Sequence, residues 1–192
     1  IADVALVVTD GHWLQRVQGI AVPARVEIRA GNGKRLASFR GDLLCTHFGL
    51  SGPVVLDASR HDLAARQADP QARFVSAFLP NAGAENLTLE LANLGRRSLG
   101  RWLAEKLPDR LADALLESAG LDPAANALRL KKEERQALLR ALLEHEIPIA
   151  GDRGFTYAEA TAGGVPLDQI RPESMESRLC PGLHLCGEIL DV

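Results

Sequence analysis

A pair of residues near the C-terminus, Gly187 and Glu188, offers the most specific chemistry in this chain. They follow the apolar stretch 181–186, and such a run after a Pro-Gly turn is typical of a buried parallel strand. Open α/β sheets bind ligands at the carboxyl ends of their strands. There the carboxylate would accept hydrogen bonds from sugar-like hydroxyls, and the glycine would admit a ligand closely. A glycine that starts a helix beside an exposed acid explains the pair equally well.

A second cluster, formed by Thr161, Ala162, Gly163 and Gly164, places flexible backbone next to a hydroxyl group. Backbone amides in such a loop can face a ligand ring or a phosphate. Neither the GxGxxG nor the GxxxxGK[ST] pattern is present, so a tight turn is the simpler interpretation of this cluster taken alone.

A third cluster lies before an expected helix. Ser51 supplies a capping hydroxyl and Pro53 a first-turn proline, which predicts a helix that begins near Pro53. The amide end of this helix would favour an anion beside His47 and Ser51. The alternative is structural, with Ser51 only capping the helix and His47 forming ordinary hydrogen bonds. The segment 49–53 does not match the G-x-S-x-G elbow of serine hydrolases.

The cysteines and histidines indicate neither a disulfide framework nor a metal site. Cys45, Cys180 and Cys186 form no CxxC pair and are odd in number, so we expect reduced, mostly buried thiols. His184 and Cys186 share one face of the expected final strand, but two ligands do not make a zinc site. We therefore expect no metal, and we assign no catalytic acid, base or nucleophile.

Composition places the chain among ordinary globular proteins, since 46% of its 192 residues are hydrophobic and its net charge is -3. Basic residues are spread along the chain, so we expect no nucleic-acid partner. No apolar run approaches the roughly 20 residues of a membrane span, and the N-terminus lacks the pattern of a signal peptide. We therefore expect a cytoplasmic protein with no membrane partner.

The first part of the chain shows the two-residue period of strands. Apolar and charged residues alternate over 22–30, and a Gly-Asn-Gly turn at 31–33 predicts a hairpin with 35–39. Besides the helix, expected near 53–65, this part should contain further strands at 42–46, 73–79 and 86–91. We interpret residues 1–92 as a largely antiparallel β-rich domain.

From about residue 98 the apolar period becomes that of helices. The stripes predict three helices, over 98–107, 108–120 and 133–146, so we interpret residues 93–147 as a small helical subdomain. A third part, residues 148–192, should hold a strand at 155–160, the tight loop and the final strand. The predicted fold class is α+β.

Three sequence blocks together resemble the BaiN/YhiN-like flavoproteins, a family of NAD(P)/FAD-dependent oxidoreductases that includes aminoacetone-oxidase-like proteins. The blocks are THFGLSGP at 46–53, EATAGGVPL at 159–167, and SMESR at 174–178 leading into PGL at 181–183 and GEILD at 187–191. In this order and spacing they extend over about three quarters of the chain. Such a resemblance is far more specific than one glycine motif.

The resemblance implies a Rossmann-like FAD-binding domain that is interrupted by a β-rich insert domain with a helical insertion. The dinucleotide-binding motif is not in this chain, so residues 148–192 would be the C-terminal remnant of the FAD domain. Gly187, Glu188 and Asp191 would meet the ribityl and phosphate region of the flavin. The segment from Thr161 through Ala162 and Gly163 to Gly164 would lie near the isoalloxazine. A substrate-side wall would be formed by His47, Gly49, Ser51 and Gly52.

The function implied is part of a FAD-dependent oxidoreductase that passes a hydride or an electron pair to a small molecule. We expect the chain to be a piece of a larger protein, without stable FAD binding or activity by itself. The sequence leaves open the substrate, the use of NADH, NADPH or neither, and the oligomeric state. The alternative is a non-catalytic module that binds a ligand or a protein, in which the glycine loops are only turns.

Overall fold

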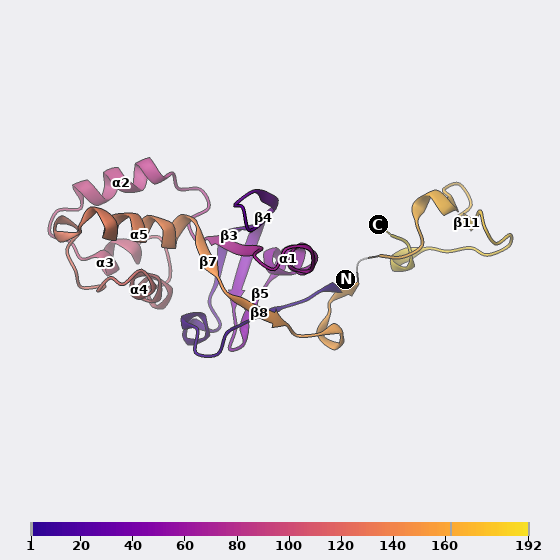
Figure 1. Ribbon diagram of the computed structural model, residues 1–192, viewed down its shortest axis with the longest axis horizontal. Helices are drawn as coiled ribbons and strands as arrows, with labels where there is room; N and C mark the ends of the chain where they lie inside the picture. The colour runs from indigo at the N-terminus through magenta and orange to yellow at the C-terminus, as the bar shows by residue number, and fades with distance from the viewer. Residues whose placement is uncertain (1, 162, 192) are drawn as a thin grey trace.

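A computed structural model describes residues 2–161 and 163–191 of the chain. Its central element is an antiparallel sheet of seven strands in the order β7-β6-β3-β4-β5-β2-β8 (Figure 1). The strands are β2 (Leu6–Val8), β3 (Ala21–Arg29), β4 (Arg35–Cys45), β5 (Gly49–Ser51), β6 (Arg73–Ala77), β7 (His145–Ile147) and β8 (Ile149–Asp152). The antiparallel β-rich part predicted for the beginning of the chain is therefore confirmed.

The sheet closes on itself because its two edge strands are one stretch of chain. Strand β7 pairs with β6, strand β8 pairs with β2, and only Pro148 separates them. Proline has no backbone N–H to donate to a ladder, so the chain changes partner at this residue. Both edges of the sheet are thereby satisfied, and the strands form a barrel.

The long hairpin β3–β4 supplies most of the inner wall of the barrel. Val22, Ala24, Val26 and Ile28 alternate inward along β3 and are buried, as the two-residue period predicts. The strands predicted separately at 35–39 and 42–46 are one continuous strand, β4, because its pairing with β3 runs without a break from Ala21 to Ile28.

Helix α1 (Pro53–Ala68) packs against the hairpin and confirms the helix predicted to begin near Pro53. Its N-cap is Gly52, which has no side chain, so the capping role predicted for Ser51 is wrong; Ser51 ends strand β5. The buried face of α1 includes Asp62, whose carboxylate accepts a hydrogen bond from Arg66 at 2.7 Å. Burial raises the pKa of Asp62.

A group of helices lies between strands β6 and β7 in the chain, namely α2 (Ala84–Asn93), α3 (Leu99–Leu103), α4 (Asp109–Ser118) and α5 (Lys132–Leu143). The helix predicted over 108–120 is confirmed, whereas the one predicted over 98–107 is shorter. The helix predicted over 133–146 ends at Leu143, and the chain then enters strand β7. Within residues 2–161 and 163–191, no helix combines the length and apolarity needed to cross a bilayer.

The strand predicted at 86–91 is wrong, because this segment belongs to helix α2. Leu87, Leu89 and Leu91 would share one face of a strand. In the structure Leu87 and Leu91 are buried, at the four-residue spacing of a helix face, and Leu89 is 62% exposed.

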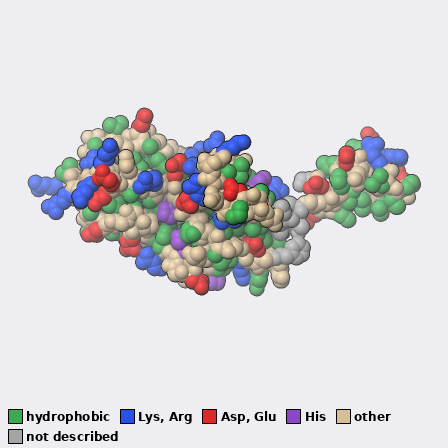
Figure 2. Space-filling view, in the orientation of Figure 1, with side chains coloured by type: hydrophobic (Ala, Val, Ile, Leu, Met, Phe, Trp, Pro, Cys, Tyr) green, Lys and Arg blue, Asp and Glu red, His purple; other side chains and the backbone are tan. Residues whose placement is uncertain are grey.

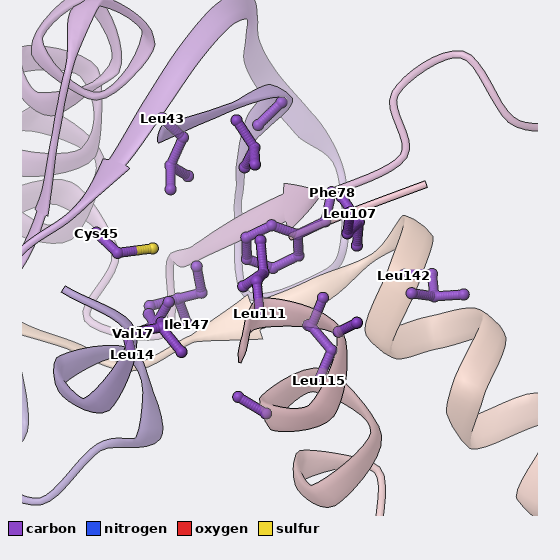
Figure 3. Packing of buried hydrophobic residues seen from close by; sticks show 14 of the residues in the cluster. Leu14, Val17, Leu43, Cys45, Phe78, Leu107, Leu111, Leu115, Leu142 and Ile147 are labelled. Carbon is purple, nitrogen blue, oxygen red and sulfur yellow. The ribbon is translucent and has the colours of Figure 1, made fainter. Parts of the chain in front are cut away.

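One hydrophobic core joins the barrel to the helices (Figure 3). Phe78 and Ile147 from the barrel side lie beside Leu111 and Leu115 of α4 and Leu142 of α5 (Figure 3). Helix α4 also contacts the short 3-10 helix η1 (Trp13–Val17). The helices are therefore anchored on the barrel by shared apolar packing.

The remaining strands are short pairs, β1 (Ala2–Asp3) with β9 (Ala160–Thr161) and β10 (Ile170–Arg171) with β11 (Glu176–Ser177). The strand predicted over 155–160 is largely wrong, since 3-10 helix η3 (Phe155–Tyr157) occupies its first half. Three further 3-10 helices are η2 (Ala127–Arg129), η4 (Leu167–Gln169) and η5 (Gly187–Ile189). Residues 163–191, which we call the C-terminal lobe, lie apart from the barrel (Figure 1).

The close approach of strands β2 and β5 predicts a strict requirement for Gly49. A Cβ atom at Gly49 would lie 2.4 Å from the backbone oxygen of Leu6, which no side-chain movement can relieve. In strand β2, Val7 lies opposite Gly49 on one side and opposite Gly151 of β8 on the other. Gly151 has open space around its Cα atom. We expect Gly49→Ala to lower the free energy of unfolding by about 2 kcal/mol or more, as measured by urea denaturation.

The matched control is Gly151→Ala. This substitution should be neutral or slightly stabilising, because the added methyl group lowers the conformational entropy of the unfolded chain and meets no atom in the folded one. Equal effects of the two substitutions would contradict this account of the barrel.

Candidate functional site

Two glycine-containing segments of the C-terminal lobe lie side by side. Val165 and Leu190 form a parallel bridge, in which Val165 N–H donates to Ile189 at 2.8 Å and Asp191 N–H donates to Val165 at 3.0 Å. These bonds bring residues 163–165 next to residues 187–191. The structure therefore joins two of the clusters that the sequence analysis selected separately.

Gly164 makes this juxtaposition possible. A Cβ atom at Gly164 would lie 2.5 Å from the backbone oxygen of Ile189 and 2.7 Å from the carbonyl carbon of Leu190. By contrast, there is open space around Gly163 and Gly187. Gly164 is thus required for contact within the lobe, whereas the backbone at Gly163 and at Gly187 is open to close approach by another group.

The buried final strand predicted to carry Gly187 and Glu188 is wrong. These residues begin the 3-10 helix η5, and the preceding Leu183 is 44% exposed. An apolar run becomes a buried strand only where neighbouring strands pair with it, and here a single bridge from His184 to Glu176 forms. Glu188 and Asp191 are both exposed, so their carboxylates are accessible to a ligand.

Thr161 ends strand β9, where it pairs with Ala2, and Ala162 lies outside the described residues. The predicted cofactor-binding residues that can be placed in the lobe are therefore Gly163, Gly164, Gly187, Glu188 and Asp191.

A carboxylate clamp holds the lobe together. Glu176 accepts a hydrogen bond from the backbone N–H of Gly182 at 2.8 Å and another from Arg171 at 3.1 Å. The Gly182 hydrogen bond, together with the charges of Arg171 and His184, holds the pKa of Glu176 below its usual value. Glu176 therefore ties the strand pair β10–β11 to the loop that leads towards η5.

The C-terminal lobe has little core and much exposed apolar surface (Figure 2). Four large side chains are 44–73% exposed, namely Leu167, Leu179, Leu183 and Ile189, whereas the buried residues of the lobe are Ile170, Ser177 and Leu190. Apolar surface gathered in this way is typical of a surface that another chain segment or a ligand covers.

The predicted substrate-side block has a clear structural role in the barrel. Gly49 N–H donates to the Thr46 hydroxyl at 3.1 Å and closes the turn between β4 and β5. Ser51 pairs with Leu44 across the same two strands. His47 is exposed at the turn, with its ring 5.0 Å from that of Phe48. Of this block, His47 is the residue most available to a ligand.

The structure does not bring this block to the glycine segments. Strands β4 and β5 lie in the barrel, and the C-terminal lobe lies beyond it (Figure 1). That His47, Gly49, Ser51 and Gly52 face a flavin remains a prediction.

Sequence reasoning missed an aromatic and cationic cluster beside this block. The guanidinium carbon of Arg153 lies 4.5 Å from the ring centroid of Phe48 and 3.9 Å from that of Tyr157. A cation held between two rings is fixed in place and carries its charge at the surface. The short sequence spacing of Arg153 and Tyr157 was a usable signal, whereas the distant Phe48 was not.

The predicted state of the thiols needs correction. Cys45 is buried in the barrel, but Cys180 and Cys186 are exposed. All three are free cysteines. Burial was expected for unpaired thiols in general, but Cys180 and Cys186 lie in the C-terminal lobe, which leaves them uncovered. Within the part of the chain that the structure describes, no group of three or more potential metal ligands is gathered.

The comparisons with known proteins agree on one family. The model of the HI0933-like protein barrel and H2TH domain matches residues 2–160. A ribosomal RNA dihydrouridine synthase of Escherichia coli (strain K12) is 36% identical over 181 residues, which cover 93% of this chain and 42% of that protein.

Two further relatives are 29% identical to the chain. One is a 3-dehydro-bile acid delta(4,6)-reductase of Clostridium scindens, over 94% of this chain and 45% of that protein. The other is a ribosomal RNA dihydrouridine synthase of Haemophilus influenzae, and its match covers 94% of this chain and 42% of that protein. The chain thus spans less than half the length of each of these curated relatives.

The exposure of the cysteines predicts their reactivity. Burial raises the pKa of Cys45 to about 12, so this thiol stays protonated and shielded. We expect two thiols, Cys180 and Cys186, to react rapidly with an aromatic disulfide reagent at mildly alkaline pH, and Cys45 to react only after denaturation. A Cys45→Ala variant is the control and should lose only the slow phase. Rapid reaction of all three thiols would show that the barrel is open.

Proposed function

The chain belongs to the HI0933-like barrel and H2TH family, and from that premise we propose that it is part of a FAD-dependent reductase. In this proposal the barrel and helices form the insert domains, and the C-terminal lobe forms one side of the flavin site. The observation that carries the proposal is the juxtaposition of residues 163–165 with 187–191, in a lobe that leaves large apolar side chains exposed.

The residues of the lobe fit a flavin by their chemistry. The exposed carboxylates of Glu188 and Asp191 can accept hydrogen bonds from ribityl hydroxyls. Gly163 and Gly187 leave open space in which a planar ring or a phosphate can approach the backbone. Exposed side chains such as Leu167 and Ile189 supply apolar contact and exclude water.

The proposal keeps the division predicted from the sequence, with residues 148–192 as the returning segment of a Rossmann-like FAD domain. Residues 1–92 and 93–147 are then the β-rich and helical parts of the insert. The curated relatives are more than twice as long as the matched segment, so the rest of the parent protein has room for the main cradle of the cofactor.

The names of the relatives support reduction of a conjugated carbon–carbon double bond. A dihydrouridine is a uridine with two hydrogens added to its ring, and a delta(4,6)-reductase saturates double bonds of its substrate. When bound, FAD supplies the hydride for such a reduction. The part of this chain in the reaction is to hold the cofactor and to exclude water. We assign no catalytic acid or base within it.

The flavin proposal is tested on the full-length protein with a carboxylate substitution. We expect full-length protein to purify yellow, and Glu188→Gln to weaken FAD binding about tenfold because a charge-assisted hydrogen bond is lost. Glu173→Gln, in the same lobe and equally a loss of one exposed charge, is the control and should bind FAD normally. Absorbance of the bound flavin during titration measures both.

A full-length protein that purifies colourless and stays colourless with added FAD would contradict the proposal and favour the alternative of a non-catalytic binding module. In the same preparation, anaerobic bleaching and reoxidation identify the substrate class. Reoxidation by an unsaturated ketone or by uridine-containing RNA would support a reductase, and the choice between them distinguishes the substrate types of the two kinds of relative.

A further inference from the structure

A cluster of arginines lies on the outer face of the barrel hairpin β3–β4. Along β3, Arg25, Glu27 and Arg29 alternate with the inward residues Val26 and Ile28. The register places Arg29 opposite Arg35 of β4. The chain carries no excess of basic residues overall, but its folding gathers three of them in one place.

Glu27 organises this cluster. It is only 5% exposed, and its carboxylate lies 3.2 Å from Arg25, 2.6 Å from Arg29 and 3.4 Å from Arg35. Burial alone would raise the pKa of Glu27, but the hydrogen bonds and charges of the arginines outweigh it and hold the pKa below its usual value. One charged carboxylate therefore fixes three guanidinium groups around it.

The arginines retain donors that Glu27 does not use. Arg25 makes no side-chain hydrogen bond to another described residue; its buried Nε atom is the one that lies 3.2 Å from Glu27, so its terminal nitrogens are the donors left for a ligand. The side chain of Arg35 is 64% exposed, and its ion pair with Glu27 has a long N–O distance of 3.4 Å. Arg29 is more fully paired, since it also contacts Glu144 at 3.0 Å. Arg25 and Arg35 are thus the two side chains with unused donors.

These side chains surround a hollow of about 440 Å³, lined by Arg25, Glu27, Arg29, Gly33, Arg35 and Glu144. Three guanidinium groups face two carboxylates, so the lining carries an excess of one positive charge. A fixed arginine set with unused donors and a net positive charge is suited to an oxyanion.

We propose that this hollow binds a phosphate group, either free phosphate or a phosphodiester of a polynucleotide. A tetrahedral anion offers oxygens in several directions, so it can meet Arg25 and Arg35 together, which a planar carboxylate cannot do as well. A phosphodiester carries one negative charge, which matches the excess in the lining. The site is separate from the proposed flavin site, and it tests the expectation, drawn from the net charge and the spread of basic residues along the sequence, that the chain has no nucleic-acid partner.

The test uses the full chain and the pair of arginines with unused donors. A short fluorescent single-stranded RNA is titrated by anisotropy at several salt concentrations, and inorganic phosphate is titrated by NMR. We expect Arg25→Gln/Arg35→Gln to weaken binding at least about tenfold. The slope of log affinity against log salt for RNA should fall by about one for each arginine removed.

The control is Arg16→Gln/Arg60→Gln, which removes the same charge from exposed positions outside the hollow. It should change affinity less than about twofold. The single variant Arg35→Gln removes an exposed side chain and should keep the fold, which thermal unfolding checks. If only the double variant unfolds, Arg35→Gln alone must still lower affinity more than the control.

Each outcome decides the proposal. Binding of RNA that depends on Arg25 and Arg35 identifies a phosphodiester site, and binding of phosphate alone with the same dependence identifies a site for a small phosphate ligand. An equal loss of affinity in the two double variants would show a general charge effect and overturn the proposal. Failure of the unsubstituted chain to bind either probe at millimolar concentration would also overturn it.

Discussion

The closure of the barrel through Pro148 is the constraint on which the rest of the structure depends. A single segment, β7 and β8, satisfies both edges of the sheet, so the inner residues of β3 and β4 are enclosed on all sides. The same segment receives the chain from helix α5 and leads it on towards the C-terminal lobe. If this closure fails, the core shared with the helices opens and the path to the lobe is lost.

The C-terminal lobe depends on different forces. It has few buried side chains, and it is held by the bridge between Val165 and Leu190 and by the hydrogen bonds of Glu176. A surface that exposes residues such as Leu179 is stable in water only at a cost in free energy, which cover by another domain or a ligand would remove. This contrast between a closed barrel and an uncovered lobe is the physical basis for proposing that the lobe lines a site shared with the rest of the parent protein.

Local periodicity predicted the elements whose burial follows from their own pattern. The hairpin, helix α1 and helix α4 belong to this group, and so does the family resemblance, because its blocks are contiguous in sequence. The errors arose where packing partners that are distant in sequence decide the local structure. Leu87 and Leu91 pack as a helix against the other helices, and the final apolar run lacks the neighbouring strands that would bury it. The clusters around Arg153 and Glu27 each include one partner that is distant in sequence, Phe48 and Glu144 respectively, and only the fold could show those contacts.

The central claim is that residues 163–165 and 187–191 together face the flavin. Hydrogen–deuterium exchange in the full-length protein, with and without FAD, tests it most directly. The account predicts that backbone amides in both segments exchange more slowly when FAD is bound, while those of the β3–β4 hairpin are unchanged. Exchange in the two segments that is unaffected by bound FAD would contradict the account.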